Sequence, residues 1–261
     1  MKVLAYTSPA RGHLYPVVPI VAALAGRGHE TRIYTLAAER EHVQAAGLAA
    51  AAIDPAIEDH AIVDWRESLP PRAAISVLRT FARRSQLEAP DLARAIERDA
   101  PDVLLIDVNC WGAATVAEAS GLPWAVYSPY LLPLRSRHAP PFGLGLPRWR
   151  GPLGRARDAA LGAMLSSTFD RAAMPTINRL RAARGLAALP SYEAQLGRPH
   201  ALLALTAEGF EYPRPDWPAN VRFVGPMDWS PPRDAPAWLA ELADPLVLVT
   251  CSTERQRDKR L

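Results

Sequence analysis

The feature that most constrains the fold of this chain is an alternation of short apolar runs with amphipathic segments. Residues 3–8 (VLAYTS) have the length of a strand, and residues 16–28 (PVVPIVAALAGRG) carry apolar side chains at helical spacing. Further strand-like runs occur at 30–36, 48–53, 101–107, 122–128, 201–206 and 220–225, and further helix-like segments at 38–47 and 111–121. Strands that alternate with helices favour a parallel sheet with helices on both faces. We therefore expect an α/β fold with a doubly wound parallel sheet.

Two proline-rich segments, residues 54–70 and 129–152, interrupt this alternation. Long segments of this kind are usually binding loops, lids or linkers. Both follow expected strands, and open parallel sheets bind ligands beyond the carboxyl ends of their strands. Their aromatic side chains either line an apolar pocket or anchor the loops to the core, because pockets and cores use the same residue types. These aromatic residues are Trp65, Tyr130, Phe142 and Trp149.

The composition of the 261 residues leads us to expect a soluble, cytoplasmic protein. No run of about 18 apolar residues is present, so we expect no membrane-spanning helix. The first residues, MKVLAYTS, enter a strand-like run directly and lack the regions of a signal peptide. Cys110 and Cys251 are the two cysteines, and their contexts favour neither a disulfide framework nor a metal site. The net charge is +3, but the arginines are scattered along the chain, so we expect no nucleic-acid partner.

Several common ligand-binding motifs are missing from the sequence. The segment TSPARGHLYP holds a single glycine, whereas a dinucleotide-binding turn needs repeated glycines for close approach to the pyrophosphate. The chain also has no GxxxxGK[ST] phosphate loop, no GxSxG nucleophile elbow, no HExxH and no Cys and His spacing typical of zinc sites. These absences disfavour a hydrolase with this fold and indicate a ligand other than NAD or ATP.

His13 and Asp107 are the strongest candidates for chemistry. We expect His13 in the loop after the first strand, before a helix that has Pro16 in its first turn. The positive end of that helix disfavours the imidazolium, which keeps the ring neutral and able to accept a proton. Asp107 ends the apolar run at the same edge of the sheet, so its carboxylate can fix the tautomer of the imidazole. A purely structural role for both residues is the alternative, because structural histidines and strand-end aspartates are common.

The C-terminal part of the sequence indicates a second unit that begins within the chain. Residues 226–236 (PMDWSPPRDAP) are rich in proline and polar side chains, as interdomain linkers are. A short helix at 237–243 and an apolar strand at 245–254 are expected to follow. We therefore predict a domain at 1–225, a linker at 226–236, and the truncated start of a further domain at 237–261.

Several segments, taken in order, resemble one family of enzymes. They are MKVLAYTSPARGHLYPVVPIVAALAGRGHETRIYT, PDVLLIDVNCWGAATVAEASGLPWAVYS, FVGP and PLVLVTCSTE, and the first contains the pattern GHxxP around His13. The order is similar to that of the family 1 glycosyltransferases with the GT-B fold, which transfer sugars from nucleotide donors to antibiotics and other natural products. The resemblance implies the Rossmann-like, N-terminal half of a GT-B architecture, with the nucleotide-sugar-binding domain missing.

The resemblance also implies a role for each candidate residue. The histidine of GHxxP is the family's general base and a later strand-end aspartate orients it, which corresponds to His13 and Asp107. Direct displacement of the nucleoside diphosphate then inverts the sugar and needs no metal or other cofactor. The co-substrate would be a UDP- or dTDP-linked sugar, with contacts at Gly12, Ser252 and Thr253. The acceptor would be a small hydrophobic aglycone held by aromatic side chains, for which the candidates are Trp65, Phe81, Trp111, Tyr130 and Phe142.

Two kinds of protein are compatible with this resemblance. The first is the acceptor-binding part of a hexosyltransferase, which we expect to bind an acceptor but to transfer no sugar without a donor-binding domain. The alternative is a non-catalytic module that binds an aglycone or assists an intact transferase. An apolar strand at 245–254 without sheet neighbours would also favour a homodimer or aggregation through residues 245–261.

Overall fold

Seven parallel strands form a single sheet in the computed structural model, which describes residues 1–243 and 245–249. The strands are β1 Lys2–Tyr6, β2 Glu30–Thr35, β3 Ala49–Ala52, β4 Val103–Asp107, β5 Trp124–Ser128, β6 Ala201–Ala204 and β7 Val221–Phe223. The helices are α1 Arg11–Gly26, α2 Arg40–Ala45, α3 Pro55–Glu58, α4 Pro70–Asp99, α5 Trp111–Ala119, α6 Pro152–Ala182 and α7 Tyr192–Leu196. Short 3-10 turns occupy Ala37–Glu39, Asp64–Arg66, Glu208–Phe210 and Ala237–Glu241. The expected doubly wound α/β fold is confirmed.

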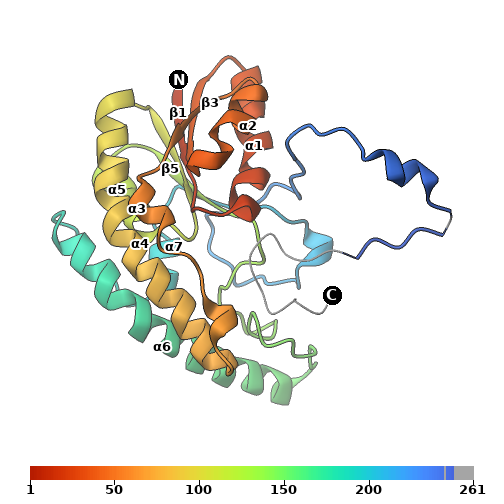
Figure 1. The fold of residues 1–261 in the computed structure, drawn as a ribbon. Coiled ribbons are helices and arrows are strands. Elements are labelled where there is room, and N and C mark those ends of the chain that lie inside the picture. Colours follow the sequence, from red (N-terminus) through yellow and green to blue (C-terminus); the bar gives the residue numbers. More distant parts are fainter. Residues whose placement is uncertain (244, 250–261) are drawn as a thin grey trace.

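The strand order, β3-β2-β1-β4-β5-β6-β7, reverses its direction at the centre of the sheet (Figure 1). The chain runs outward from β1 to β3, then returns to place β4 on the other side of β1 and continues outward to β7. β1 and β4 pair directly, with Val3 opposite Val103 and Tyr6 opposite Ile106. Ligands of open α/β sheets bind at the carboxyl ends of the strands where the order reverses. The carboxyl ends of β1 and β4 are therefore the expected position of a ligand-binding site.

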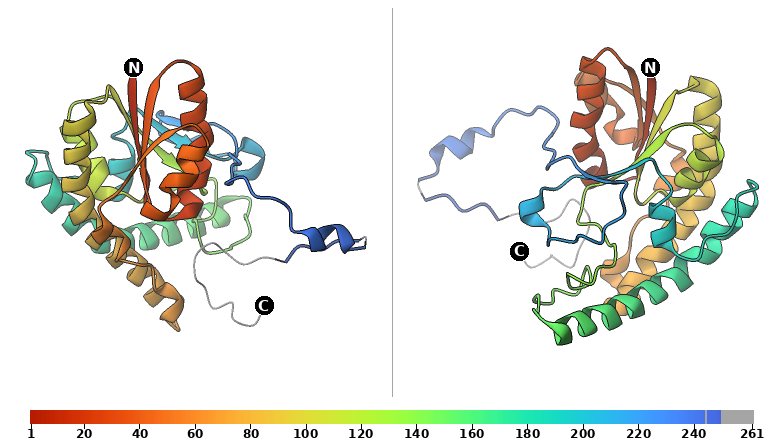
Figure 2. Two further views of the ribbon diagram at one scale, coloured as in Figure 1. Left: turned by 45° about the horizontal axis from the view of Figure 1, so that its top comes forward. Right: turned by 180° about the vertical axis from the view of Figure 1, so that it is seen from behind.

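Helices cover both faces of the sheet, as two views of the ribbon make clear (Figure 2). Alternate residues of a strand point to opposite faces, and the neighbours Leu104 and Leu105 of β4 belong to two separate core clusters. The larger cluster contains residues of α4, α5, α6 and α7. The smaller cluster contains residues of α1 and α2. Both faces of the central strands are consequently buried, as in other parallel sheets.

Helix α1 begins earlier than the sequence suggested. We expected it to start at Pro16, but it starts at Arg11 and carries Pro16 and Pro19 inside the helix. The reason is burial: Leu14 is buried on the same face as the valines of the later turns, so the apolar stripe begins before Pro16. His13 therefore lies in the first turn of α1, and the prediction that it belongs to a loop is wrong.

Two long helices that the sequence pattern did not predict pack together on one face. They are α4, with 30 residues, and α6, with 31 residues. The expected irregular segment is confirmed for residues 129–151, but residues 54–70 contain α3 and a 3-10 turn, so that expectation is wrong for those residues. Among the residues that the structure describes, no helix combines the length and the apolar character needed to cross a membrane.

The described residues after 226 first pack against the core cluster on the α1 face, through Met227 and Trp229, and then extend away from the sheet. The ring of Trp229 packs edge-to-face on Tyr15 of α1, with the ring centroids 5.2 Å apart. Beyond it the chain forms an open loop (Figure 2) that contains a 3-10 turn, Ala237–Glu241, in place of the expected helix. Residues 245–249 form no strand, contrary to expectation, and the rest of that expected strand lies outside the described residues. The division into domain, linker and second domain stays a prediction.

Candidate active site

The carboxyl ends of β1 and β4 bring His13 and Asp107 into direct contact. Asp107 lies two residues after Leu105, which packs on the face covered by α1, so its side chain points to the same face. His13 belongs to the first turn of α1, and its Nδ1 lies 2.8 Å from Oδ2 of Asp107. The aspartate side chain is fully buried, whereas the histidine side chain is 15% exposed. The structure thus joins the two residues that the sequence analysis had paired.

Asp107 is surrounded by hydrogen-bond donors. Its Oδ2 accepts from the backbone N–H and the hydroxyl of Ser8, at 3.3 and 3.1 Å, and from the hydroxyl of Tyr127 at 3.0 Å. Its Oδ1 accepts from the backbone N–H of Asn109 at 2.8 Å. Burial on its own raises the pKa of this carboxyl, but His13 and the hydrogen bonds outweigh burial, so the pKa of Asp107 is lowered. The carboxylate is therefore ionised and fixed in place, as a group that orients an imidazole must be.

The second ring nitrogen of His13 faces Asn109. Nδ2 of Asn109 lies 3.2 Å from Nε2 of His13, and Oδ1 of Asn109 accepts from the hydroxyl of Tyr130 at 2.8 Å. The sequence reasoning did not select Asn109, nor Ser8 and Tyr127, which bind the aspartate. The available signal for Asn109 was its position two residues beyond the end of β4, at the same edge of the sheet as the pair.

One of the predicted aromatic residues, Tyr130, lies beside His13, and a second, Phe142, packs on Tyr130. The ring of Tyr130 meets the imidazole edge-on, with centroids 5.8 Å apart, and Phe142 stacks on Tyr130 with centroids 6.1 Å apart. The Phe142 side chain is 48% exposed. This pair of rings therefore offers an accessible apolar surface next to the imidazole, of the kind that binds an aromatic or polyketide-like ligand.

The other predicted contacts are placed elsewhere. Phe81 and Trp111 meet edge-to-face in the core, and Trp111 is 1% exposed, which leaves it almost no surface with which to touch a ligand. Trp65 is partly buried in the turn Asp64–Arg66, under the guanidinium of Arg66. Gly12 is exposed and directly precedes His13 in α1. The two remaining candidates for donor contacts, Ser252 and Thr253, lie outside the described residues.

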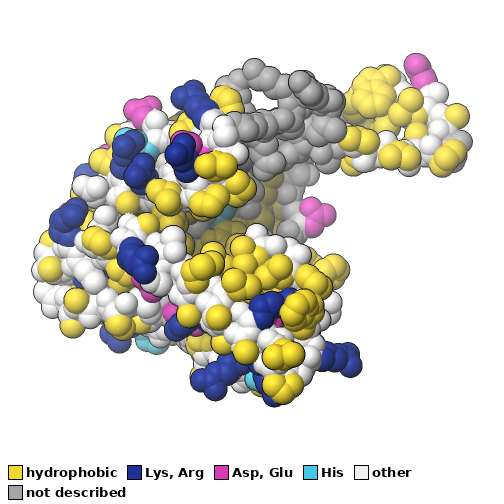
Figure 3. Space-filling model, turned by 90° about the horizontal axis from the view of Figure 1, so that it is seen from below, with side chains coloured by type: hydrophobic (Ala, Val, Ile, Leu, Met, Phe, Trp, Pro, Cys, Tyr) yellow, Lys and Arg dark blue, Asp and Glu magenta, His cyan; other side chains and the backbone are white. Residues whose placement is uncertain are grey.

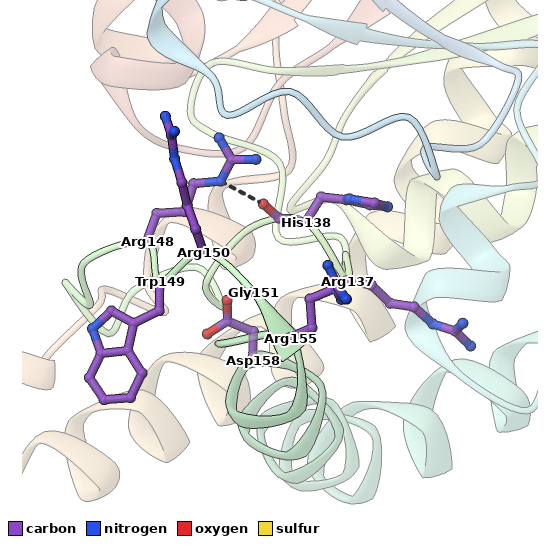
Figure 4. Close-up of a pocket in the computed structure, with 8 residues that line it drawn as sticks. All are labelled: Arg137, His138, Arg148, Trp149, Arg150, Gly151, Arg155 and Asp158. Carbon is purple, nitrogen blue, oxygen red and sulfur yellow. Dashed lines mark hydrogen bonds between the residues drawn. The ribbon is translucent and has the colours of Figure 1, made fainter. Parts of the chain in front are cut away.

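A strongly cationic pocket lies between the irregular segment and the start of α6 (Figure 4). Its volume is about 310 Å³, and its lining residues are Arg137, His138, Arg148, Trp149, Arg150, Gly151, Arg155 and Asp158. Asp158 is paired with Arg157 at 2.8 Å. Within the described ranges no salt bridge joins an acidic side chain to the guanidinium group of Arg137, Arg150 or Arg155, although Asp216 accepts from the backbone N–H of Arg137. Apart from Trp149, which the sequence offered as a pocket or anchor residue, none of these residues was a candidate.

The face of the molecule seen from below carries both kinds of surface. Hydrophobic side chains gather there, and arginine side chains lie around them (Figure 3). In the orientation of Figure 1 the strands run downward from the N-terminus, so this is the face toward which their carboxyl ends point. Apolar surface with charged groups around it at this edge of an α/β sheet is typical of a site for a small organic ligand.

The fold and the site define a class: a doubly wound α/β protein with a histidine–aspartate pair where the strand order reverses. The homologues and structural neighbours of this chain are natural-product glycosyltransferases of the GT-B type. The resemblance that the sequence suggested is thereby confirmed. No protein-family model matches the chain.

Three proteins illustrate the extent of this similarity in sequence and in fold. The whole chain aligns with 4'-demethylrebeccamycin synthase of Lentzea aerocolonigenes, at 33% identity over 280 residues and 65% of that protein. The elloramycin glycosyltransferase ElmGT of Streptomyces olivaceus is 31% identical over 134 residues, which are 47% of this chain and 35% of that one. The fold matches the glycosyltransferase SsfS6 of Streptomyces sp. SF2575 with a TM-score of 0.60 and 18% identity, over 94% of this chain and 60% of that one. The chain spans less than two thirds of the length of each of these proteins.

Proposed function

We propose that this chain is the acceptor-binding part of an inverting glycosyltransferase, which moves a hexose from a nucleoside-diphosphate sugar to a hydroxyl of a hydrophobic natural product. The observation that carries the proposal is the 2.8 Å contact between His13 and the buried carboxylate of Asp107. Its position where the strand order reverses supports a ligand-binding role. Two structural neighbours support the choice of ligands, because SsfS6 is complexed with thymidine diphosphate and the spinosyn rhamnosyltransferase SpnG with spinosyn aglycone.

In this mechanism His13 is the general base. Its Nδ1–H donates to Asp107, so the lone pair is on Nε2, the nitrogen that takes the proton of the acceptor hydroxyl. As the proton moves to Nε2, the acceptor oxygen forms a bond to the anomeric carbon from the side opposite the leaving group. The bond from that carbon to the diphosphate oxygen breaks, and the diphosphate leaves with the electron pair. Asp107 stabilises the imidazolium that results, and a positioned base typically contributes about 10²–10⁴-fold to the rate.

Different groups of residues near His13 would bind the acceptor and the donor. Tyr130 and Phe142 provide the apolar surface nearest to the imidazole, so we propose that an aromatic or polyketide-like acceptor binds against them. The donor would be a UDP- or dTDP-linked sugar. Gly12 has no side chain to block the approach of that sugar to the first turn of α1. The proposed donor contacts of Ser252 and Thr253 would come from the next part of the chain.

The test joins this chain to the remaining portion of its relative 4'-demethylrebeccamycin synthase and compares the chimera with the chain alone. Calorimetry measures the binding of aromatic and polyketide-like hydroxyl compounds, and chromatography follows sugar transfer from dTDP-glucose and UDP-glucose. We expect acceptor binding by both proteins and transfer only by the chimera, with inversion at the anomeric carbon. Acceptor binding without transfer by a chimera that binds the donor would favour the non-catalytic module, and absence of acceptor binding would contradict the proposal.

A further inference from the structure

Asn109 contacts the proposed base, His13, and also Asp107 and Tyr130, which both lie against that base. It lies in the turn between β4 and α5, where its backbone N–H donates to Oδ1 of Asp107 at 2.8 Å. Its side chain spans Tyr130 and His13: Oδ1 accepts from the tyrosine hydroxyl at 2.8 Å, and Nδ2 lies 3.2 Å from Nε2 of the imidazole. The side-chain amide therefore stands at the ring nitrogen that would have to accept a proton.

The direction of these hydrogen bonds fixes the state of the imidazole. Because the hydroxyl of Tyr130 donates to Oδ1, the NH₂ group of Asn109 is the part that faces His13. An amide NH₂ can only donate, so Nε2 must accept with its lone pair and cannot carry a proton. The ring proton then belongs on Nδ1, where Asp107 accepts it. This is the neutral tautomer that a general base at Nε2 requires.

We propose that Asn109 is a positioning residue that holds His13 in this tautomer and covers Nε2 until an acceptor hydroxyl takes the place of the amide. Nε2 has one lone pair, so it cannot bind the amide and the acceptor hydroxyl together. Acceptor binding must therefore displace the amide of Asn109. Tyr130 connects that displacement to the proposed acceptor surface, since its ring stacks on Phe142 while its hydroxyl holds the amide. The inference rests on the proposed function for its meaning, but its test does not require transfer.

The test is an NMR titration of His13 in the chain as it stands. The ¹⁵N shifts of Nδ1 and Nε2 report which nitrogen carries the proton, and the resonances of His13 are assigned by their loss in His13→Gln. In the described part of the chain, Asp107 and Tyr130 contact the ring of His13, and Tyr127 contacts its backbone carbonyl and Asp107. All three of these titratable residues are retained in the variants of Asn109. A change in those variants therefore reports the loss of the amide itself.

Four variants should raise the pKa of His13 by different amounts, and a fifth variant is the control. Asn109→Ala and Asn109→Ser remove the donor that favours the neutral ring, so the pKa of His13 should rise by about 0.5–1 unit, the size of one hydrogen bond. Asn109→Asp places an anionic acceptor at Nε2, so the pKa should rise by more than about 1 unit. Tyr130→Phe should give a smaller rise than Asn109→Ala, because the amide stays in place but loses its orienting partner. Asn220→Ala, which removes an asparagine bonded to the Leu196 and Pro199 carbonyls, should leave His13 unchanged.

The same variants in the chimera give a second readout. The acidic limb of the pH profile of kcat/KM should move by the same amount as the NMR titration, which a purely structural role for Asn109 would not cause. Two results would overturn the inference: a wild-type Nε2 that carries the proton above the titration, or a His13 titration that is the same in wild type, Asn109→Ser and Asn109→Asp. A chimera that fails to transfer sugar would contradict the proposed function and leave the NMR result intact.

Discussion

The carboxyl edge at β1 and β4 and the arginine-lined pocket beside α6 are held in place by different means. At the sheet edge, regular elements position each group, as where Asp107 lies opposite Tyr127 in the pairing of β4 with β5. At the pocket, an irregular segment is tied to its surroundings by arginine side chains that bind backbone carbonyls. Arg157 donates to the carbonyl of Pro147 at 2.7 Å, and Arg148 donates to that of His138 at 3.0 Å.

Because of this difference, the molecule can keep an accurate geometry at the sheet edge and can change shape at the arginine-lined pocket. Proton transfer depends on the placement of groups to within a fraction of an ångström, and rigid elements provide such placement better than loops do. Irregular segments tolerate changes of sequence and shape, and binding residues often occur on them for that reason. The chain therefore combines a fixed base with an adaptable neighbouring surface. Two buried contacts made by glycines allow this contrast to be tested.

The largest effect should follow from Gly112→Ala, next to the sheet edge. A Cβ on Gly112 would lie 1.9 Å from the backbone oxygen of Ser85, which is fully buried in α4. The two helices would have to separate, which we expect to lower the free energy of unfolding by about 3 kcal/mol or more. Urea unfolding followed by circular dichroism measures this change. Gly26→Ala is the matched control, since a Cβ there meets nothing within 4 Å, and equal stability of the two variants would contradict the account.

A dependence of stability on pH should arise from Glu88 in the same region. Its Oε2 accepts from the backbone N–H of Gly112 at 3.0 Å, and burial raises its pKa from 4.5 to about 8. Between those pH values the folded chain keeps a proton that the unfolded chain loses, so the stabilisation is complete below the lower value and is lost as pH rises. The slope should reach at most about 1.4 kcal/mol per pH unit.

Glu88→Gln should flatten this dependence, because the amide oxygen still accepts from Gly112 but no longer titrates. Stability is measured by urea unfolding at a series of pH values between 4.5 and 8. Glu97→Gln, at an exposed position of the same helix, is the control and should keep the wild-type slope. An unchanged slope in Glu88→Gln would show that the buried carboxyl is not its source.

The smallest effect should follow from Gly154→Ala at the arginine-lined pocket. A Cβ there would lie 2.3 Å from the backbone oxygen of Trp149, almost as close as the contact at Gly112. Trp149 is 55% exposed and lies in the irregular segment, so we expect the segment to shift. Because such a shift costs less than the separation of two buried helices, we expect the free energy of unfolding to fall by about 1–2 kcal/mol, less than in Gly112→Ala. A loss as large as that of Gly112→Ala would mean that this segment is as rigid as the helix pair.

The same contrast explains what the sequence could predict. The sheet edge was predictable because continuous apolar runs such as VLLID are suited to buried strands, and a polar residue that ends such a run marks the carboxyl edge. His13 and Asp107 could be paired on that basis. The start of α1 was missed because Pro16 locally suits a first turn, whereas burial of Leu14 extends the helix further toward the N-terminus.

Residues whose role depends on a side-chain contact that no strand end or helix start marks in the sequence could not be predicted. Asn109 is an ordinary turn residue in the sequence, and only its contact with Tyr130, 21 positions later, orients its amide toward His13. Trp111 was expected at an acceptor, but nothing local distinguishes an aromatic ring in the core from one that lines a pocket. In the structure it is the first residue of α5, and its ring packs in the core against Phe81 of α4 and Phe169 of α6.

The central claim is that His13, oriented by Asp107, is a base rather than a structural residue. The most direct measurement compares transfer rate and acceptor affinity in the chimera for wild type, His13→Ala and the control His138→Ala, whose histidine is exposed. If His13 is the base, we expect His13→Ala to keep its fold and to bind acceptor within about threefold of wild type. Its turnover should fall by about 10²–10⁴-fold. Wild-type turnover in His13→Ala, or a variant that fails to fold, would contradict the claim.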